Sequence, residues 1–207
     1  MIVDIADYVS RWNTSPLGSL GRSPWAMTTG AQDYVAQILS ALGDGYEARE
    51  GVAVHATAVV ETGATIKAPA VLGPRCFVSS SALLRGGVYL DEDCIIGPAV
   101  ELKTTFVFQG SKVAHLSFVG DSILGADVNI EAGAIVANYR NELEQKRILI
   151  AMAGEIIDTG VDKFGALVGD GSRIGANAVI APGAILAPGS TVPRLGLVDQ
   201  HPQAGRA

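Results

Sequence analysis

Aliphatic residues recur at every sixth position over a long stretch of the chain. They are Val54, Val60, Ile66, Leu72, Val78, Leu84, Leu90, Ile96 and Leu102, and Phe108 and Ala114 extend the same register. Four positions after each comes a small or apolar residue, as at Ala58, Ala64 and Cys76. A fixed period held over about sixty residues indicates a repeat architecture, which decides the fold before local propensity does.

This period predicts a triangular coil. Each six-residue unit supplies a short strand and a turn, the aliphatic residue points inward, and the small residue lets the chain turn the corner. Three units close one coil, and coils stack at the strand spacing of about 4.8 Å. Each coil buries its core only against its neighbours. The fold class is therefore all-β, a single-stranded parallel β-helix, although spacing alone does not give its handedness.

Two interruptions of the period are expected. The first is a short break between Ala114 and Phe118, after which the register resumes as Phe118, Leu124, Ile130 and Val136. Residues 137–167 then lose the pattern, which predicts a long loop ejected from the coil; loops of this length are usually functional or mobile. The repeat returns at Val168 and continues to Val192, and Pro193 ends it.

The first fifty residues follow a different pattern. Residues 30–43 place apolar side chains at helical spacing (Tyr34, Ile38, Leu39 and Leu42), and Gly43 ends the helix. A shorter helix is expected over residues 3–12, and Trp12 and Trp25 are expected to dock these pieces onto the main body. We therefore divide the chain into a helical extension (1–50), a β-helix (51–194) with its ejected loop at 137–167, and a tail (195–207).

Composition limits the functions that this fold can serve. The net charge is −6 and no run of Lys and Arg occurs, which argues against nucleic acid as a partner. No apolar stretch is long enough to span a membrane, and the N-terminus lacks the basic and apolar regions of a signal peptide. Two cysteines are too few for a disulfide framework. A cytoplasmic protein is expected.

Residues 18 apart should stack on one edge of adjacent coils. Cys76 and Cys94 fulfil this spacing at inward positions and are interpreted as core thiols without chemistry. Lys67, Arg85 and Lys103 should form a ladder of cations. Such a ladder is either a solvated edge or a site for a phosphate or carboxylate, because stacked like charges are costly unless an anion neutralises them.

The histidines carry the remaining candidate chemistry. His115 lies in the expected break of the register, where a re-aimed side chain tends to mark a site, although an incidental surface histidine fits as well. His55, at the start of the coil, and His201, in the tail, look incidental. A zinc site of the kind used by γ-class carbonic anhydrases needs three histidine ligands, and the chain has only these three, widely separated.

Several segments together bring one family into view. They are Arg85-Gly-Gly, Glu101-Leu-Lys103, Ser111-Lys-Val-Ala-His115-Leu-Ser, Asn129-Ile-Glu-Ala132 and Asn138-Tyr139. In this order and spacing they resemble the acetyltransferase domain of the bifunctional UDP-N-acetylglucosamine pyrophosphorylase/glucosamine-1-phosphate N-acetyltransferases. The long insert after Tyr139 looks more like archaeal sugar-1-phosphate nucleotidylyltransferases that carry the same domain. The resemblance implies a left-handed β-helix.

The resemblance also implies roles for individual residues. His115 would be the general base that takes a proton from the sugar amine as it attacks the thioester. The substrate-binding residues would be Arg85, Lys103, Phe118, Asn129 and Lys163, and the cofactor-binding residues Ala132, Asn138, Tyr139 and Ala176. The family forms homotrimers with acetyl-CoA, a co-substrate, in the groove between neighbouring prisms, and its acyl transfer requires no metal. The implied activity is N-acetylation of an amino-sugar phosphate such as glucosamine-1-phosphate.

The sequence departs from the family at several points. Phe118 stands where the family usually has Tyr, which removes a hydroxyl near the phosphate, and Ala176 replaces a Ser near the cofactor. No Gly-rich nucleotide-binding motif precedes the coil, so nucleotidyl transfer is not expected. Two alternatives therefore stay open: acyl transfer to a different amine, and a non-catalytic binding or assembly subunit. The acceptor sugar, the acyl length and the pathway are not given by the sequence.

Overall fold

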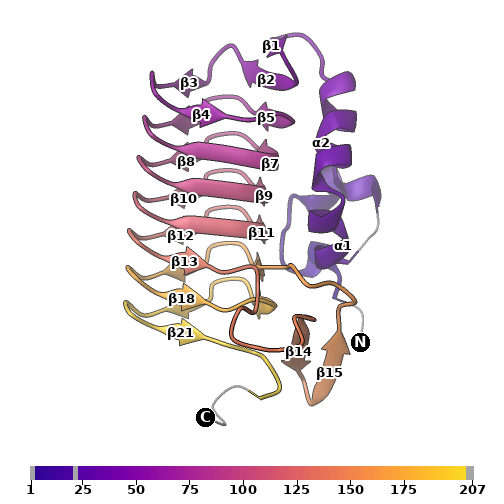
Figure 1. Ribbon diagram of the computed structural model, residues 1–207. Coiled ribbons are helices and arrows are strands. Elements are labelled where there is room, and N and C mark those ends of the chain that lie inside the picture. Colours follow the sequence, from indigo (N-terminus) through magenta and orange to yellow (C-terminus); the bar gives the residue numbers. More distant parts are fainter. Residues whose placement is uncertain (1–2, 21–22, 204–207) are drawn as a thin grey trace.

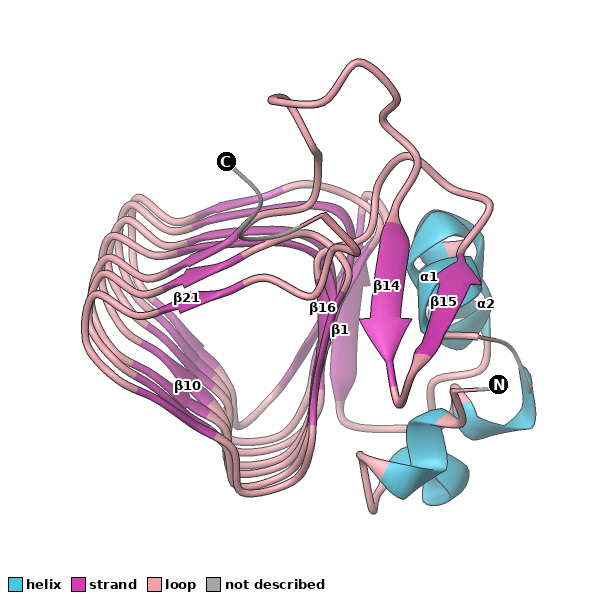
Figure 2. Ribbon diagram, turned by 90° about the horizontal axis from the view of Figure 1, so that it is seen from below, coloured by secondary structure: helices cyan, strands magenta, loops and turns pink. Residues whose placement is uncertain are grey.

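Short parallel strands wind into a prism of triangular cross-section in the computed structural model, which describes residues 3–20 and 23–203 (Figures 1 and 2). The expected fold class, a left-handed parallel β-helix with a helical N-terminal extension, is confirmed. Among the residues in these two ranges, no helix is long and apolar enough to cross a membrane.

The prism has three faces. The second face is a seven-stranded sheet of β3 (Val59–Val60), β6 (Phe77–Val78), β8 (Ile95–Ile96), β10 (Lys112–Val113), β12 (Asn129–Ile130), β17 (Arg173–Ile174) and β20 (Thr191–Val192). The first and third faces form one sheet, because three long strands run round the edge between them: β7 (Leu83–Leu90), β9 (Glu101–Val107) and β11 (Phe118–Leu124). We call this the long-strand edge.

The shorter strands complete these two faces. The first face also holds β2 (Val52–His55), β5 (Ala70–Leu72), β16 (Ala166–Val168) and β19 (Ala184–Leu186). The third face holds β4 (Thr65–Ile66), β13 (Ile135–Val136), β18 (Val179–Ile180) and β21 (Leu197–Val198). An antiparallel strand, β1 (Tyr46–Arg49), pairs with β2 at the N-terminal end. Parallel pairing thus continues to residue 198, and the division into extension, β-helix and tail stays a prediction.

The interior of the prism is made by the residues that the period places inward. Leu72, Leu84, Leu90, Ile96 and Leu102 are fully buried in one continuous cluster. Cys76 and Cys94 lie buried in the same cluster as free thiols, as the spacing of 18 predicted. Burying each large aliphatic side chain contributes about 1.5–3 kcal/mol, so stacking of neighbouring coils supplies the stability that a single coil lacks.

The register shortens at two places on the long-strand edge. The inward residue after Leu102 is Val107, and the one after Val119 is Leu124, so each step takes 5 residues instead of six. Thr104, in the first shortened step, has a φ of 54°, and Asp121, in the second, has a φ of 45°. Positive φ also occurs at regular corners, for example at Asp93 (59°) and Leu116 (63°). The five-residue step, and not the backbone angle, therefore marks this edge.

The expected break between Ala114 and Phe118 is wrong. Val113 and Val119, six apart, are both inward residues of regular strands. Phe108 is buried, but outside the prism, where its ring lies 5.8 Å from that of Trp12. The sequence misled because Phe108 and Ala114 are apolar and fit an uninterrupted six-residue frame as well as the true inward residues do.

The extension lies along one side of the prism (Figure 1). It consists of three short 3-10 turns, η1 (Ile5–Asp7), η2 (Trp12–Thr14) and η3 (Gly18–Leu20), followed by α1 (Pro24–Thr29) and α2 (Ala31–Ser40). The helix expected over 30–43 is confirmed as α2. The helix expected over residues 3–12 is wrong, because that segment forms only η1 and the start of η2.

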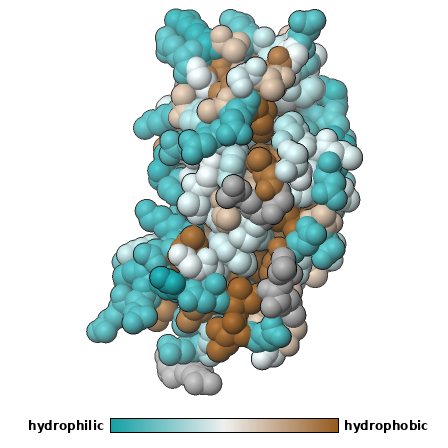
Figure 3. All heavy atoms as spheres, turned by 90° about the vertical axis from the view of Figure 1, so that its right-hand side faces the viewer, coloured by the Kyte–Doolittle hydropathy of each residue, from teal (hydrophilic) through white to brown (hydrophobic). Residues whose placement is uncertain are grey.

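The extension and the insert together cover the first face. The outward side chains of that face are all buried: Val71, Tyr89, Phe106, Ile123, Leu167 and Ile185. They pack against Met27 and Val35 of the helices and against the insert hairpin, β14 (Leu149–Met152) and β15 (Glu155–Asp158) (Figure 2). Seen from this side, the outer surface is mostly hydrophilic, with apolar side chains in patches (Figure 3). Among the described residues, neither the extension nor the hairpin covers the second and third faces.

Candidate functional site

Asp121, at the second shortened corner, gathers several of the candidate residues. Its side chain is 9% exposed, and its carboxylate accepts a hydrogen bond from the Lys103 ammonium at 2.6 Å. The side-chain amide of Asn138 donates to the same carboxylate oxygen. Lys103 comes from β9, Asp121 from β11 and Asn138 from the start of the insert. The structure therefore joins a residue expected to bind substrate to one expected to bind cofactor through a carboxylate that the sequence did not single out.

Gly120 allows this convergence. A Cβ placed on Gly120 would lie 2.8 Å from Cζ of Phe118 and 2.8 Å from Cγ of Asn138, closer than real Cβ atoms come. The aromatic ring and the amide thus approach the backbone at one point, because residue 120 has no side chain. The Phe118 ring thus lies next to Asn138, which bonds to Asp121. The position at which the family usually has Tyr is therefore part of this site.

The ladder of cations exists, but it is partly neutralised within the chain. Arg85 and Lys103 are partners in register, and the backbone of Lys67 pairs one strand above. The Arg85 guanidinium lies 2.6 Å from the Glu101 carboxylate, as Lys103 lies beside Asp121. An external anion is therefore not needed to relieve repulsion between the stacked cations.

Lys163 reaches the same region from the far end of the insert. With Lys103 and Asp121 it lines a cavity of about 260 Å³, whose other walls are Thr28, Thr29, Gln32, Gly86 and Thr104. Lys163 is exposed, and no ion pair or hydrogen bond engages its ammonium within the described part of the chain. We call this space, bounded by the long-strand edge and the extension, the edge cavity.

The second group of candidates lies on a different edge, between the second and third faces. His115, Ala132 and Ala176 follow one another on successive coils: the Gly133 N–H donates to the His115 carbonyl and the Asn177 N–H to the Ala132 carbonyl, both at 3.0 Å. The His115 side chain is exposed and makes no hydrogen bond among the described residues. We call this the His115 edge. Its corner is a regular one, which corrects the expectation that His115 sits in the irregular turn.

Two further candidates lie outside both groups. Asn129 is exposed on the second face, between Lys112 and Arg173 in register. Tyr139 is half-exposed, and the Lys146 ammonium lies 5.4 Å from the centre of its ring. The structure thus brings together Lys103, Phe118, Asn138 and Lys163 at the long-strand edge, with Arg85 adjacent. It does not bring His115 into contact with them inside one chain.

Residues that hold the insert in place escaped the sequence analysis. Arg140 is buried and forms a bidentate ion pair with Asp199 of the tail, at 2.7 and 2.9 Å. These bonds hold the pKa of Asp199 below its usual value, while burial lowers the pKa of His201 next to it. His201 is therefore part of a docked tail, and its expected lack of a chemical role stays a prediction. No local pattern links residues 140 and 199, so only the fold could reveal the pair.

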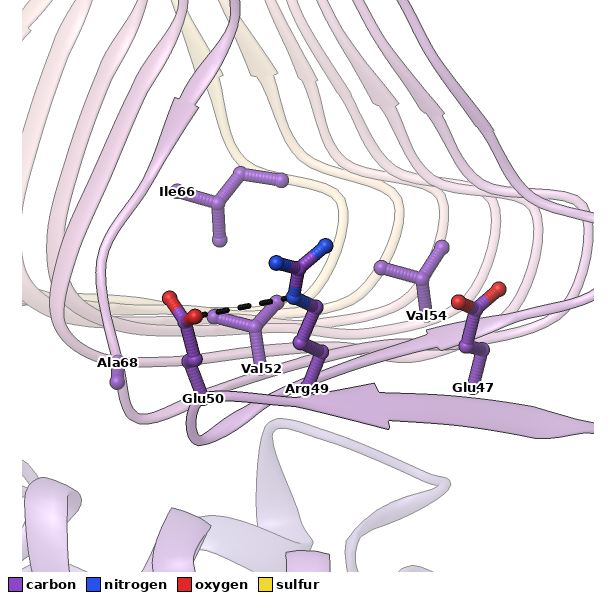
Figure 4. Close-up of a pocket in the computed structure, with 7 residues that line it drawn as sticks. All are labelled: Glu47, Arg49, Glu50, Val52, Val54, Ile66 and Ala68. Carbon is purple, nitrogen blue, oxygen red and sulfur yellow. Dashed lines mark ion pairs between the residues drawn. The ribbon is translucent and has the colours of Figure 1, made fainter.

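Other hollows carry less of the expected chemistry. The open N-terminal end of the β-helix holds a cavity of about 500 Å³ with Val52, Val54 and Ile66 as its apolar walls and the Arg49–Glu50 ion pair at its rim (Figure 4). It contains none of the candidate residues. Among residues 3–20 and 23–203, no group of three or more His, Cys, Asp or Glu side chains is arranged to hold a metal ion.

Comparison with known proteins points to one group of enzymes. No protein-family model matches the chain. The chain is 30% identical over 177 residues to a bifunctional sugar-1-phosphate nucleotidylyltransferase/acetyltransferase of Sulfurisphaera tokodaii. The aligned region is 84% of this chain and 43% of that protein. It is 36% identical over 137 residues to the bifunctional protein GlmU of Nitratidesulfovibrio vulgaris (61% of this chain, 30% of the relative).

A third relative, the GlmU of Desulfitobacterium hafniense, is 40% identical over 89 residues, which are 43% of this chain and 20% of the relative. The chain spans less than half the length of each of these proteins. The similarity and the stacked coils confirm the resemblance found in the sequence. The chain is a hexapeptide-repeat β-helix protein, similar over most of its length to the C-terminal part of bifunctional nucleotidylyltransferase/acetyltransferases.

Proposed function

We propose that this protein is an acetyl-CoA-dependent N-acetyltransferase acting on an amino-sugar phosphate such as glucosamine-1-phosphate. The observation that carries the proposal is the convergence of Lys103, Phe118, Asn138 and Lys163 around Asp121 beside an open cavity. Relatives whose names include acetyltransferase share this part of the chain. In this proposal residues 51–194 form the catalytic domain, residues 1–50 and the insert 137–167 are accessory to it, and the protein works in the cytoplasm.

The reaction needs a base, an anion site and room for the acyl donor. In our proposal His115 accepts a proton from the sugar amine while the nitrogen bonds to the acetyl carbon, and the C–S bond breaks to release coenzyme A as its thiolate, which takes up the proton from the imidazolium. A neutral imidazole is a suitable base for this step. Arg85, Lys103 and Lys163 would bind the phosphate, and Asn129 the sugar. Ala132 and Ala176 keep the His115 edge free of bulky side chains, with Asn138 and Tyr139 as further contacts for the donor.

We further propose a homotrimer. The first face is closed by the extension, whereas the third face and its border expose Leu116, Val179, Leu195 and Leu197. Val179 and Leu197 are partners in register, and neighbouring exposed apolar side chains of this kind mark an interaction surface. Packing of third faces between neighbouring prisms would bury them and would form a groove along the His115 edge, where acetyl-CoA would lie. In such a trimer, the two groups of candidates that lie apart within one chain would meet between neighbouring chains.

Acyl transfer to a different amine is the second candidate, and Phe118 favours it. A phenol at this position could donate a hydrogen bond to the acceptor, and sites built around such a bond strongly reject ligands that cannot form it. Its loss allows a different acceptor while the same base and donor site are kept. A panel of amines, from glucosamine-1-phosphate to other amino-sugar phosphates, separates the two candidates.

The test is thiol release from acetyl-CoA in the presence of glucosamine-1-phosphate. We expect His115→Ala to lower kcat by about 10²- to 10⁴-fold, the contribution of a positioned general base. His55→Ala is the matched control, because His55 packs edge-on against Tyr46 at the far N-terminal end. Wild-type turnover by His115→Ala would refute the role of the base. A folded wild-type protein that acetylates no amino-sugar phosphate would refute the proposed function.

A further inference from the structure

The junction of α1 and α2 lies over the edge cavity. Thr28 and Thr29 end α1, Gln32 opens α2, and all three line the cavity opposite Lys103 and Lys163. We infer that the helical extension forms one wall of the acceptor site, and that Gln32 contacts a phosphate monoester held there by the two lysines. This inference rests on the proposed function for the identity of the sugar, but not for the presence of the anion site.

The extension is held against the coil by close backbone contact. A Cβ on Gly87 would lie 2.8 Å from the carbonyl carbon of Ala31 and 2.8 Å from the amide nitrogen of Gln32. Gly87 has a φ of 90° and sits where the register of β7 shifts, so this glycine serves both the turn and the approach of α2. Because backbone meets backbone here, the backbone of Gln32 is held beside the cavity.

A second contact ties the extension to the end of the insert. The ring of Trp25 in α1 meets the ring of Phe164 edge-on at 5.9 Å, and Phe164 directly follows Lys163. The Phe164 N–H in turn donates to the Asn138 carbonyl at 3.1 Å. One packed chain thus runs from the extension through Lys163 to Asn138, and the extension helps to set the position of the free lysine.

The charges of the cavity favour an anion. Lys103 and Asp121 neutralise each other at 2.6 Å, and Lys163 adds a positive charge without a carboxylate partner in the described structure. A phosphate monoester can accept hydrogen bonds from both ammonium groups, and such bonds between charged groups are stronger than bonds between neutral ones.

Gln32 supplies the specificity that point charges lack. Its side chain is exposed and makes no hydrogen bond in the described parts of the chain, so both amide N–H donors are available. Thr28 and Thr29, in contrast, donate their hydroxyl protons to the Trp25 carbonyl. A cavity of about 260 Å³ is smaller than the ~300–1,000 Å³ of pockets that enclose whole small-molecule ligands. It therefore receives the phosphorylated end of the acceptor.

The experiment measures binding by the full-length protein, with inorganic phosphate and with glucosamine-1-phosphate as two separate probes in calorimetric titrations. We expect Gln32→Ala to weaken binding of both probes about tenfold, since one hydrogen bond to a charged group is lost. Gln37→Ala, an exposed glutamine on the same helix, is the matched control and should bind as wild type does. In turnover, Gln32→Ala should raise KM for the acceptor and leave kcat and KM for acetyl-CoA unchanged.

Each outcome decides something. Equal affinities of Gln32→Ala, Gln37→Ala and wild type would overturn the inference, as would a wild-type protein that binds neither probe. Phosphate binding that depends on Gln32 without any thiol release would support the inference and refute the proposed function. Normal turnover with an unchanged acceptor KM in Gln32→Ala would overturn the inference and support the proposed function.

Discussion

The Arg140–Asp199 pair should decide whether the insert stays docked on the β-helix. The Arg140 side chain is 3% exposed and Asp199 is 22% exposed. Two bonds join the guanidinium to Asp199, a third reaches the Pro182 carbonyl at 2.8 Å, and a longer one reaches the exposed Glu142 carboxylate at 3.3 Å, while Nε has no partner among the described residues. Asp199→Ala would leave the desolvated guanidinium with this exposed carboxylate as its remaining counter-charge in the described structure.

The magnitude follows from this burial. Removing one partner of a buried ion pair costs about 3–5 kcal/mol. Because Asp199 keeps some contact with water, which screens the interaction, we expect about 2–3 kcal/mol. The cost falls on local opening of the insert and tail, since their contacts are few compared with those of the stacked coils. By 1.36 kcal/mol per factor of ten, the opened population should rise about 30- to 160-fold.

Amide hydrogen exchange measures this opening directly. The Ala151 N–H in β14 donates to the Gln200 carbonyl of the tail at 2.7 Å, so it is protected only while the tail is docked. We expect its exchange in Asp199→Ala to accelerate by the factor above. Arg147→Met is the control, because Arg147 and Asp158 form a half-exposed pair at 3.4 Å, and such pairs contribute little. Unchanged protection of Ala151 in Asp199→Ala would refute the reasoning.

Two further predictions concern pH and assembly. Burial lowers the pKa of His201, so the undocked tail binds more protons than the docked tail below the ordinary histidine pKa near 6.5. Docking should be fully stable above that pH and weaken as the pH falls below it, seen as faster exchange at Ala151 after correction for intrinsic rates. His201→Gln should remove this dependence. Leu197 is 69% exposed on the third face, so Leu197→Glu should convert the trimer to monomers by light scattering with unchanged circular dichroism; a trimer that persists in the variant would contradict the proposed interface.

Periodicity predicted the part of the fold that depends on stacking. The inward positions from Val54 to Leu102, except Val60, which is 37% exposed, are confirmed, as are the stacked thiols and helix α2. They follow from spacing, because a buried position favours apolar side chains. The docking of Trp12 and Trp25 is also confirmed, by their contacts with Phe108 and Phe164.

The rest depends on contacts that no local pattern encodes. The five-residue steps could not be seen, since Phe108 fits the six-residue frame and is buried for another reason, against Trp12. The spacing of 18 singled out Lys103, whereas Lys163 was found only through the resemblance. Asp121, the partner of Lys103, and the place of Gln32 beside the edge cavity appear only when elements far apart in sequence are brought together. The roles of His115 and its companions stay predictions.

The two shortened corners also fix where the coils can be exchanged. Coils that begin at residues 54, 72 and 168 repeat after eighteen residues, whereas those that begin at 90 and 107 repeat after seventeen. A designer who duplicates or transplants a coil must therefore splice like with like: an eighteen-residue cassette placed between Val107 and Leu124 would push Asp121 out of phase with Lys103. The molecule is thus modular at its ends and of fixed length in the middle, where its candidate chemistry lies.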